Sequence, residues 1–503
     1  MKTKKILLGS LLAGGLLALF RLASGRAFYA KPASKLSVSA AIDAYIEEQM
    51  RRLHIPGISL AIIEGDRIAY TRGFGQAQPG GEAPSPQTPF FIGSLTKSIT
   101  ALAVMQLTEA GKIELDAPVQ RYLPWFRVAD PQASAQISVR QLLNQTSGLS
   151  AVAGSIALAV CDDHPHATER QARALSTLKL NHPPGSKWEY SNLNYNILGL
   201  IIEVVSGESY ADYIQSHIFD PLEMCHSYTS RKEAKPNGLA MGHRHWFSLP
   251  FPARNLPIPQ GSLPSGQLIS SAEDMAHYLI AHLNGGCFGD AQILSAAGIQ
   301  ELHRGAAEFS MGRAPAGRYA MGWFDMDIGQ TKTFSHSGNV PDFSAFMALL
   351  PEQKRGVVLL INADPYGLPL VTEEVGTGLL ALLAGQQPPP IKLDFIQWIM
   401  RLLPLIPILQ IVDVFATLRS IRNWSRYPQL RPSGGRVGWK HILPALIPNL
   451  ALAALLGYLR SSGLLGFIQL FMPDLAWITR ICGGFGGIWA FLRTGLILKA
   501  LRK

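Results

Sequence analysis

The chain has 503 residues, more than one ordinary domain needs, and its hydrophobic content of 48% is high for a soluble protein with only 16% charged residues. The net charge of +10 could indicate a nucleic-acid-binding protein, but residues 391–503 alone hold 14 Lys and Arg against 3 Asp and Glu. The remaining residues are nearly neutral, with 31 basic and 32 acidic side chains. Because the basic excess lies in an otherwise apolar region, we expect no nucleic-acid binding.

The N-terminal residues have the pattern of an export signal. Lys2, Lys4 and Lys5 precede an uncharged apolar run over residues 6–20. A basic start followed by a short apolar run is typical of a secretory signal peptide, and a run of about fifteen residues is short for a membrane span. We therefore expect residues 1–30 to be a signal peptide or a retained signal anchor, and the domain that follows to lie outside the cytoplasm.

The first pattern that suggests chemistry is Ser94-x-x-Lys97, at the start of an apolar run over residues 99–107 that predicts a buried helix. Residues three apart lie on one face of a helix, so the Lys97 amine can reach the Ser94 hydroxyl. A serine hydroxyl must lose its proton as it attacks a carbonyl, and a lysine can accept that proton if burial lowers its pKa. Alone, such a pattern more often marks a helix-capping serine beside a solvent-exposed lysine.

A second cluster, Tyr190 to Asn192, follows a turn signal at residues 183–185 and precedes an apolar run over residues 197–205. These residues are therefore expected on a short loop between helices. A phenol held near Lys97 could carry protons between nucleophile and leaving group, while the Asn192 amide could orient Lys97 and the substrate. Taken without Ser94, the simpler interpretation is an ordinary turn with asparagine as the helix cap.

The third cluster, His336 to Asn339, begins at the end of a predicted strand over residues 332–336. The period of two in a strand places His336 and Gly338 on one face, and a glycine there lets a substrate backbone approach closely. The backbone amides of Asn339 and Ser94 could then form an oxyanion hole for a tetrahedral intermediate. By itself, a single histidine on a strand is more often a packed or surface residue.

Together and in this order, the three clusters resemble the motifs of the serine β-lactamase and penicillin-binding protein superfamily. Within it they are most similar to the class C β-lactamase and DD-peptidase-like branch. The resemblance covers about residues 36–385 and is strengthened by further segments in family order: residues 55–61, 73–75, 142–149 and 264–276.

The resemblance implies a serine hydrolase that acts on an ester or amide through an acyl-enzyme, with a small molecule or a peptide as substrate. Ser94 is the implied nucleophile, and Lys97 and Tyr190 share the proton transfers. Other implied site residues orient the substrate or hold the developing oxyanion: Asn192, His336, Gly338 and Asn339. No metal or organic cofactor is implied.

One departure from the family pattern leaves the substrate open. His336 stands where the broader family has the lysine of its Lys-Thr-Gly motif. A lysine would supply a fixed positive charge for a substrate carboxylate, whereas histidine is mostly neutral at pH 7. Peptidase, esterase and β-lactamase activities are therefore all consistent with this chain.

The expected fold class is α+β, because strand patterns at both ends of residues 36–385 enclose a long helical middle. The strands are predicted at residues 58–64, 67–72, 319–324, 332–336, 343–349 and 357–361. The family resemblance implies an antiparallel sheet flanked by helices together with a helical subdomain, with the active site in the cleft between them.

The character of the chain changes after a Pro-rich linker at residues 386–394. Residues 395–503 predict a membrane region, because they contain long apolar runs with few charges. These runs are residues 395–418, 441–459, 463–478 and 481–492, the last two separated by Arg480. We expect about three transmembrane helices, with one of the last two runs lying in the membrane interface or packed tightly.

Positive charge predicts the orientation of this membrane region. The loop between the first two runs is rich in basic residues: Arg419, Arg422, Arg426, Arg431, Arg436 and Lys440. Short, positively charged loops stay in the cytoplasm, which places the start of the first span outside. We therefore expect a multi-pass protein of a bacterial cell membrane, in contact with the lipid bilayer and with its catalytic domain on the extracytoplasmic side.

Two alternatives remain open. A metal hydrolase could use loop residues that are common zinc ligands, although no His-Glu-x-x-His pattern occurs: Asp162, Asp163, His164, His166, His243 and His245. A penicillin-binding sensor or scaffold could keep the nucleophile and become acylated without turnover. The four cysteines suggest neither a zinc site nor a disulfide framework, and the sequence does not indicate an oligomeric state.

Overall fold

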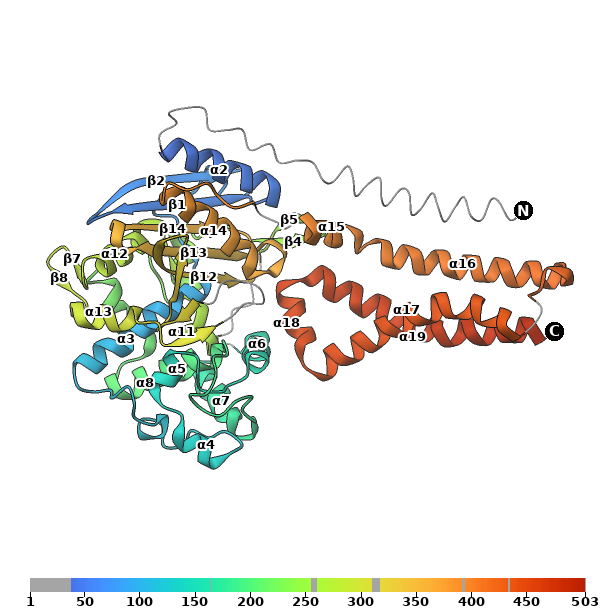
Figure 1. Cartoon of the computed structure of the whole chain (residues 1–503), viewed down its shortest axis with the longest axis horizontal. Helices are drawn as coiled ribbons and strands as arrows, with labels where there is room; N and C mark the ends of the chain where they lie inside the picture. The colour runs from blue at the N-terminus through green and yellow to red at the C-terminus, as the bar shows by residue number, and fades with distance from the viewer. Residues whose placement is uncertain are drawn as a thin grey trace.

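The computed structural model describes residues 38–162, 164–254, 260–309, 317–390, 394–432 and 435–502. The expected signal segment, residues 1–30, lies outside the described residues. Within them, a body of sheet and helices is followed by a bundle of long helices that projects from one side (Figure 1).

An antiparallel eight-stranded sheet forms the centre of the body. In spatial order its strands are β2 (Arg67–Gly75), β1 (Gly57–Glu64), β14 (Arg355–Ile361), β13 (Phe343–Leu350), β12 (Thr331–Val340), β11 (Phe324–Ile328), β10 (Gly317–Tyr319) and β9 (Ala307–Phe309). The strand β1 thus pairs both with β2 and with the last strand, since Ile58 of β1 lies opposite Ile361 of β14. Three two-stranded pairs complete the strands: β3 (Phe90–Phe91) with β6 (Ile269–Ser270), β4 (His243–Trp246) with β5 (Leu249–Pro252), and β7 (Cys287–Phe288) with β8 (Ala291–Gln292).

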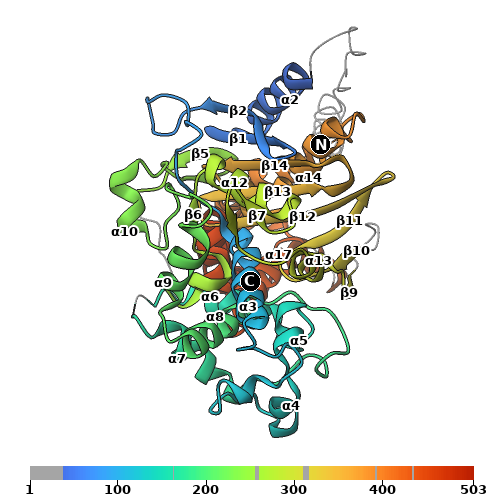
Figure 2. The ribbon, with the colours of Figure 1, turned by 90° about the vertical axis from the view of Figure 1, so that its left-hand side faces the viewer.

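Both faces of the sheet are covered, which explains why β1 is apolar along most of its length. Ala61 and Ile63 belong to one buried cluster, and Leu60 and Ile62 belong to another, as the period of two in a strand requires. The helices α2 (Val38–Leu53) and α14 (Pro369–Leu383) cover one face. The other face packs against α12 (Ala272–Leu283) and the helical region beyond it (Figure 2).

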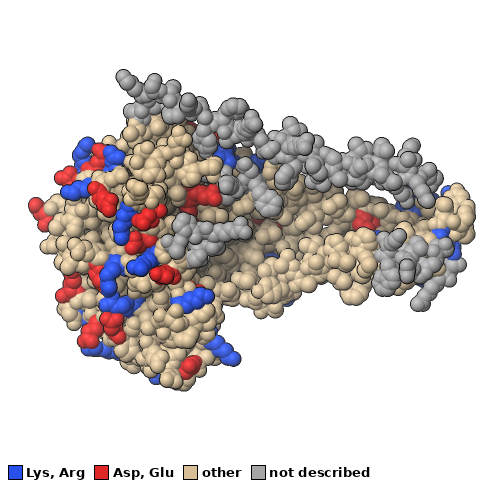
Figure 3. All heavy atoms as spheres, in the orientation of Figure 1, with Lys and Arg blue, Asp and Glu red and all other residues tan. Residues whose placement is uncertain are grey.

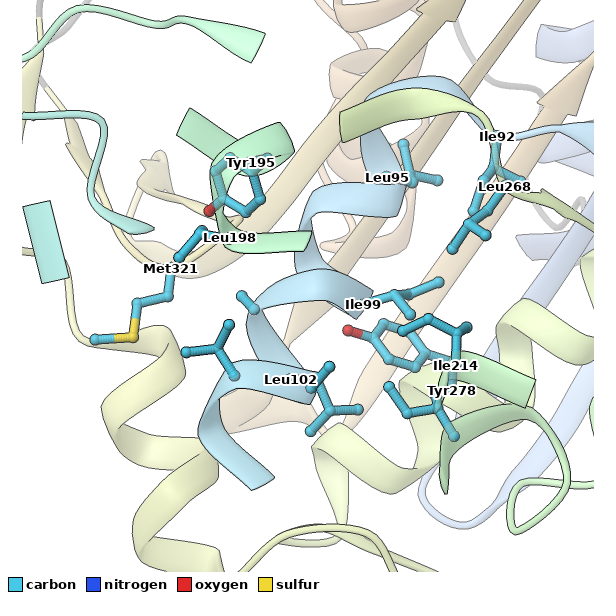
Figure 4. Close-up of a cluster of buried hydrophobic side chains, with 14 of the residues drawn as sticks. Ile92, Leu95, Ile99, Leu102, Tyr195, Leu198, Ile214, Leu268, Tyr278 and Met321 are labelled. Atoms are coloured by element: carbon cyan, nitrogen blue, oxygen red, sulfur yellow. The ribbon is translucent and has the colours of Figure 1, made fainter. Parts of the chain in front are cut away.

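The middle of the chain forms the helical region, which is organised around α3 (Thr96–Glu109). Figure 4 shows Ile99 and Leu102 of this helix in a buried cluster with Tyr278 and Ile214. The remaining helices of the region are α4 (Pro131–Gln136), α5 (Val139–Leu143), α6 (Ala151–Ala159), α7 (Ala167–Ala174), α8 (Asn192–Ser206), α9 (Tyr210–Ile214), α10 (Arg231–Ala234), α11 (Leu263–Gly266) and α13 (Ala296–His303).

The α+β fold expected from the sequence is confirmed, but one predicted strand is wrong. Residues 319–324 do not form a strand, because β10 ends at Tyr319 and β11 begins at Phe324. Gly322, in the turn between them, has a φ of +81° and packs against the backbone of Ser98 in α3. A tight turn that touches a helix leaves no room for a continuous strand. The strand predicted at residues 332–336 is also longer than expected, since β12 extends to Val340.

The C-terminal region consists of α15 (Asp394–Leu402), α16 (Leu405–Arg426), α17 (Gly435–Ser461), α18 (Leu464–Phe471) and α19 (Pro473–Arg502). Among the described residues, 3 helices are long and apolar enough to cross a membrane: residues 396–426, 441–461 and 473–501. On the face shown in Figure 3, charged side chains are spread over the body, whereas the described part of the bundle is mostly uncharged.

The last two apolar runs divide differently from the prediction. Arg480 does not separate two helices, because α19 continues through it. Its guanidinium finds a polar partner in the side chain of Gln469, which allows the helix to continue without leaving this charge unpaired. The break comes earlier, between α18 and α19, at Met472 and Pro473.

Polar side chains within the bundle satisfy one another. Asp413 of α16 accepts a hydrogen bond from Trp489 at 2.8 Å and lies 3.1 Å from Arg493, both in α19. The Gln410 amide donates to Asn449 of α17 at 2.8 Å. Such contacts hold apolar helices together in lipid, where an unpaired polar group is costly.

The short helix α18 packs against α6 of the body as well as against the bundle helices α17 and α19. Gly466 of α18 approaches Ala159 of α6. Gly463, the residue before the first residue of α18, approaches Ile156 of the same helix α6. Immediately after α18, the Asp474 carboxylate accepts a hydrogen bond at 2.8 Å from the backbone amide of Phe247. The C-terminal region therefore makes specific contacts with α6 and with the turn between β4 and β5.

A buried ion pair fixes the turn between β12 and β13. Asp342, 1% exposed, receives two hydrogen bonds from Arg244 of β4, at 2.7 and 2.8 Å. We predict that Arg244→Ala destabilises the fold by about 3 kcal/mol, because it leaves a buried carboxylate without its partner. In a thermal-shift measurement the control Arg67→Ala, which removes an exposed pair at 3.7 Å to Glu64, should cost less than about 1 kcal/mol. Equal melting temperatures for the two variants would contradict the prediction.

Candidate active site

Ser94 lies in a short 3-10 turn, Gly93–Leu95, that leads directly into α3. The turn and the helix place Lys97 one turn beyond Ser94, with the amine Nζ 3.0 Å from the hydroxyl Oγ. Ser94 is partly exposed, whereas Lys97 is fully buried. A hydroxyl open to a ligand thus sits beside an amine shielded from water.

The Lys97 amine has two further oxygen partners. It donates hydrogen bonds to the side-chain oxygen of Asn192 at 2.7 Å and to the carbonyl oxygen of Ser265 at 2.6 Å. Asn192 is the first residue of α8, and Ser265 belongs to α11, so three helices converge on this one nitrogen. Burial lowers the pKa of Lys97 well below its ordinary value, because no carboxylate accompanies the amine to compensate for its lost hydration.

Tyr190 completes the group around the nucleophile. Its ring lies over the Lys97 amine, with 4.9 Å between Nζ and the ring centroid. Burial raises the pKa of Tyr190 well above its ordinary value, and a hydrogen bond with Ser94 acts in the opposite direction. The phenol therefore keeps its proton in this environment and contacts the Ser94 hydroxyl.

His336 lies in β12, and its imidazole packs beside Tyr190, with 6.1 Å between the ring centroids. Burial and the nearby Lys97 lower the pKa of His336 to about 3, so the ring is neutral at neutral pH. The Nδ1 nitrogen lies 2.6 Å from the carbonyl oxygen of Ser337. Because a carbonyl only accepts, Nδ1 carries the hydrogen and Nε2 faces the hydroxyl of Tyr319 at 3.5 Å.

Two glycines let β12 approach the nucleophile turn. A Cβ at Gly338 would collide with the carbonyl oxygen of Ile92, and a Cβ at Gly93 would collide with the backbone of Gly338 and Asn339. Gly93 also has a φ of +55°, which disfavours other residues. The backbones of Ser94 and Asn339 are thereby brought to the same cavity.

The edge of β12 is open at this point. β11 pairs with β12 only from Thr331 to Ser335, so the following residues are not covered by β11. A cavity of about 380 Å³ lies along this edge and contains all of the sequence-predicted site residues except Lys97, which lies buried behind Ser94, and Gly338, which packs against the turn.

Aromatic and apolar side chains from distant segments form much of the cavity wall. Trp188 and Phe324 lie on one side, next to Tyr190 and His336. The C-terminal region also contributes to the cavity wall, through Phe467 and Phe471 of α18. The segment expected to meet the membrane thus contributes directly to the candidate active site.

Several residues of this site are not among those predicted from the sequence. Ser265 contributes a backbone carbonyl, which no residue type reveals. Tyr195, whose ring centroid is 5.8 Å from the Lys97 amine, could have been found, because it follows Asn192 by three residues on a helix. Asp364 accepts a hydrogen bond from the Asn339 side chain at 2.7 Å, and Glu373 of α14 lines the cavity, but both come from segments without a recognisable motif.

The candidate metal ligands do not form a cluster in the described part of the chain. Among those residues, no group of three His, Cys, Asp or Glu side chains is arranged to hold a metal ion. His243 and His245 face backbone carbonyls of Asn362 and Leu53 at 3.1 and 3.2 Å. Asp163 lies outside the described residues.

Comparison with known proteins decides the family. The Beta-lactamase family model matches residues 42–374, well over half of the chain. The chain belongs to the β-lactamase family. This result confirms the resemblance found in the sequence motifs.

The similar curated proteins include Protein flp and a penicillin-binding protein. Protein flp of Staphylococcus aureus (strain MW2) is 31% identical over 343 residues, which cover 67% of this chain and 66% of that protein. The match to this relative therefore spans just under two thirds of its length. Penicillin-binding protein 4 of Amycolatopsis lactamdurans is 29% identical over 350 residues, covering 67% of this chain and 88% of the relative.

Solved structures agree on the fold. The octameric penicillin-binding protein homologue from Pyrococcus abyssi is similar with a TM-score of 0.62 and 30% identity, covering 70% of this chain and 78% of that one. A class C β-lactamase mutant has a TM-score of 0.58 at 21% identity, covering 69% of this chain and 97% of that one. The second similarity concerns the fold alone.

Proposed function

We propose that this protein is a serine hydrolase that cleaves an ester or amide through an acyl-enzyme formed on Ser94. The observation that carries the proposal is the buried Lys97 amine, 3.0 Å from the Ser94 hydroxyl and without a carboxylate partner among its hydrogen bonds. Burial disfavours the charged amine and so favours the form that can accept a proton.

The hydrogen-bond count around Lys97 supports this role. A neutral amine has two hydrogens, and Asn192 and Ser265 offer two acceptors at 2.7 and 2.6 Å. The lone pair is then left for the third neighbour, the Ser94 hydroxyl, which can donate its hydrogen to it. In this arrangement Lys97 is the general base and Asn192 is the residue that orients it.

The steps of the reaction follow from this arrangement. As the Ser94 oxygen bonds to the substrate carbonyl carbon, its proton passes to Lys97, and the backbone amides of Ser94 and Asn339 stabilise the oxyanion. Tyr190 relays the proton to the leaving group as that bond breaks. Water then attacks the acyl-enzyme, which releases the acid and restores Ser94.

The residues beside the nucleophile constrain the acyl substrate but do not select one of the three activities. His336 and Gly338 supply a neutral, close-fitting strand edge beside the nucleophile. Peptidase, esterase and β-lactamase activities all use the same acyl-enzyme chemistry. A sensor that is acylated without turnover would differ only in the final attack by water, so the test below measures both steps.

We also propose that α16, α17 and α19 span a bacterial cell membrane and that the body lies on its extracytoplasmic side. The length and apolar character of the three helices support the span. The basic residues at the end of α16 and in the segment that follows it support a cytoplasmic location for that end of the bundle, opposite the body.

The nucleophile and base can be tested by active-site labelling. Ser94→Ala and Lys97→Ala should each abolish labelling of the full-length protein by a fluorophosphonate probe, because one removes the nucleophile and the other its base. The control Ser186→Ala changes an exposed serine outside the cavity and should label normally. Full labelling of Ser94→Ala would refute the assignment. Release of p-nitrophenol beyond one equivalent from an ester distinguishes turnover from trapping.

A pH profile tests the state of Lys97. We predict that kcat/KM for an uncharged ester falls as the pH is lowered through the Lys97 pKa and stays level through neutral pH, because the base must be unprotonated. A rise that begins only near about pH 10 would indicate an ordinary solvated lysine. Lys97→Arg serves as a control, since arginine keeps its proton and should remove the activity at every pH.

The native cysteines allow a test of orientation. Cys161, Cys225 and Cys287 are exposed on the body, whereas Cys482 in α19 is buried. A membrane-impermeant maleimide should label the first three on intact cells. A second variant has these three cysteines replaced by serine and carries Gln429→Cys in the exposed turn after α16. Its new cysteine should react with the maleimide only after permeabilisation. The reverse pattern would place the body in the cytoplasm.

A further inference from the structure

Glu373 brings a carboxyl group into the candidate active site. It lies on α14, on the wall of the cavity that contains Ser94 and Tyr190. Its Oε1 oxygen accepts a hydrogen bond of 2.8 Å from the hydroxyl of Ser337, the residue next to His336 in β12. This contact fixes the carboxyl group. Among the described residues, Ser337 is its hydrogen-bond partner.

The cavity offers no matching positive charge. Of the described residues that line it, Glu373 is the one with a carboxyl side chain, and none is Lys or Arg. Lys97 lies behind Ser94 and turns its amine toward Asn192 and Ser265. His336 is neutral at neutral pH. A carboxylate on a substrate would therefore face another carboxyl group here and find no cation to bind.

Aromatic rings add a second feature that favours a cation. Trp188, Tyr190 and Phe324 line the same cavity as Glu373. Aromatic faces attract ammonium groups through their quadrupole, most strongly where water is excluded. Burial raises the pKa of the Glu373 carboxyl, and a cation beside it would offset this effect by favouring the ionised form.

We propose that Glu373 is a specificity-determining residue that binds a cationic amine of the substrate. The acyl compounds accepted by this cleft then carry an ammonium group, and compounds with a carboxylate in its place are rejected. Ser337 acts as a positioning residue, because its hydroxyl holds one carboxyl oxygen and leaves the other for the ammonium group. The proposal rests on the proposed function, since the substrate is an acyl compound only if Ser94 is acylated.

The test compares isosteric substrates on the full-length protein in a nonionic detergent. The probes are p-nitrophenyl esters whose acyl chains end in trimethylammonium, tert-butyl or carboxylate, each with two to four methylene groups. The first two differ in charge but hardly in shape. We expect the protein to favour the cationic ester over the tert-butyl ester by roughly tenfold in kcat/KM, the scale of a cation held by aromatic rings where water is excluded.

The variants assign this preference to one side chain. Glu373→Gln should remove most of it, and Glu373→Lys should turn it toward the carboxylate ester. Ser337→Ala should reduce it in part, because the carboxyl loses its fixed orientation. The control Glu352→Gln, in an exposed turn outside the cavity, should retain the full preference.

The outcomes for the two proposals are distinguishable. If Ser94 is labelled and the tert-butyl ester is hydrolysed, but no chain length shows a preference for the cation, the Glu373 proposal is overturned and the hydrolase stands. Retention of the preference in Glu373→Gln overturns it in the same way. If the unmodified protein is neither labelled nor active on any ester, the proposed function fails and the Glu373 proposal fails with it. The comparison on the unmodified protein is decisive even if a variant does not fold.

Discussion

The structure depends on one costly arrangement, the complete burial of the Lys97 amine. A lysine removed from water is tolerated only if hydrogen-bond partners replace its hydration or if it gives up its charge. Here the partners are oxygens of Ser94, Asn192 and Ser265, which come from three separate helical segments. The need to satisfy one nitrogen therefore binds the helical region together at the point where a carbonyl compound would react.

A second constraint is the close approach between the sheet and the helical region. A Cβ at Gly93 would collide with the backbone of Gly338 and Asn339, and a Cβ at Gly338 would collide with the carbonyl group of Ile92. Because neither glycine has a side chain, these two segments, which are far apart in the chain, can come into direct backbone contact. The contact also links both ends of the body, since β12 pairs with β13, β13 with β14, and β14 with β1.

Features that depend on neighbouring residues are predictable from the sequence of this chain, whereas features that depend on long-range packing are not. The spacing of Ser94 and Lys97 predicts their contact because both lie on one helical turn. The strand at residues 343–349 was found because its apolar pattern is continuous, whereas the strand predicted at residues 319–324 was wrong because contact between Gly322 and α3 imposes a turn. Glu373 could not be found, since the adjacent residues Glu373 and Glu374 look alike in the sequence, and only the contact with Ser337 singles out the first.

The contact of α18 with the cavity has a consequence for how a substrate would reach Ser94. Phe467 and Phe471 belong to a helix that leads without a spacer into α19, while the glycines at its start are seated on α6. In the proposed orientation, Ser94 is then held at a fixed distance from the lipid headgroups, rather than at the end of a flexible linker. Encounters would be governed by the layer of solution next to the bilayer, so the enrichment of an amphiphile in that layer matters more than its bulk concentration.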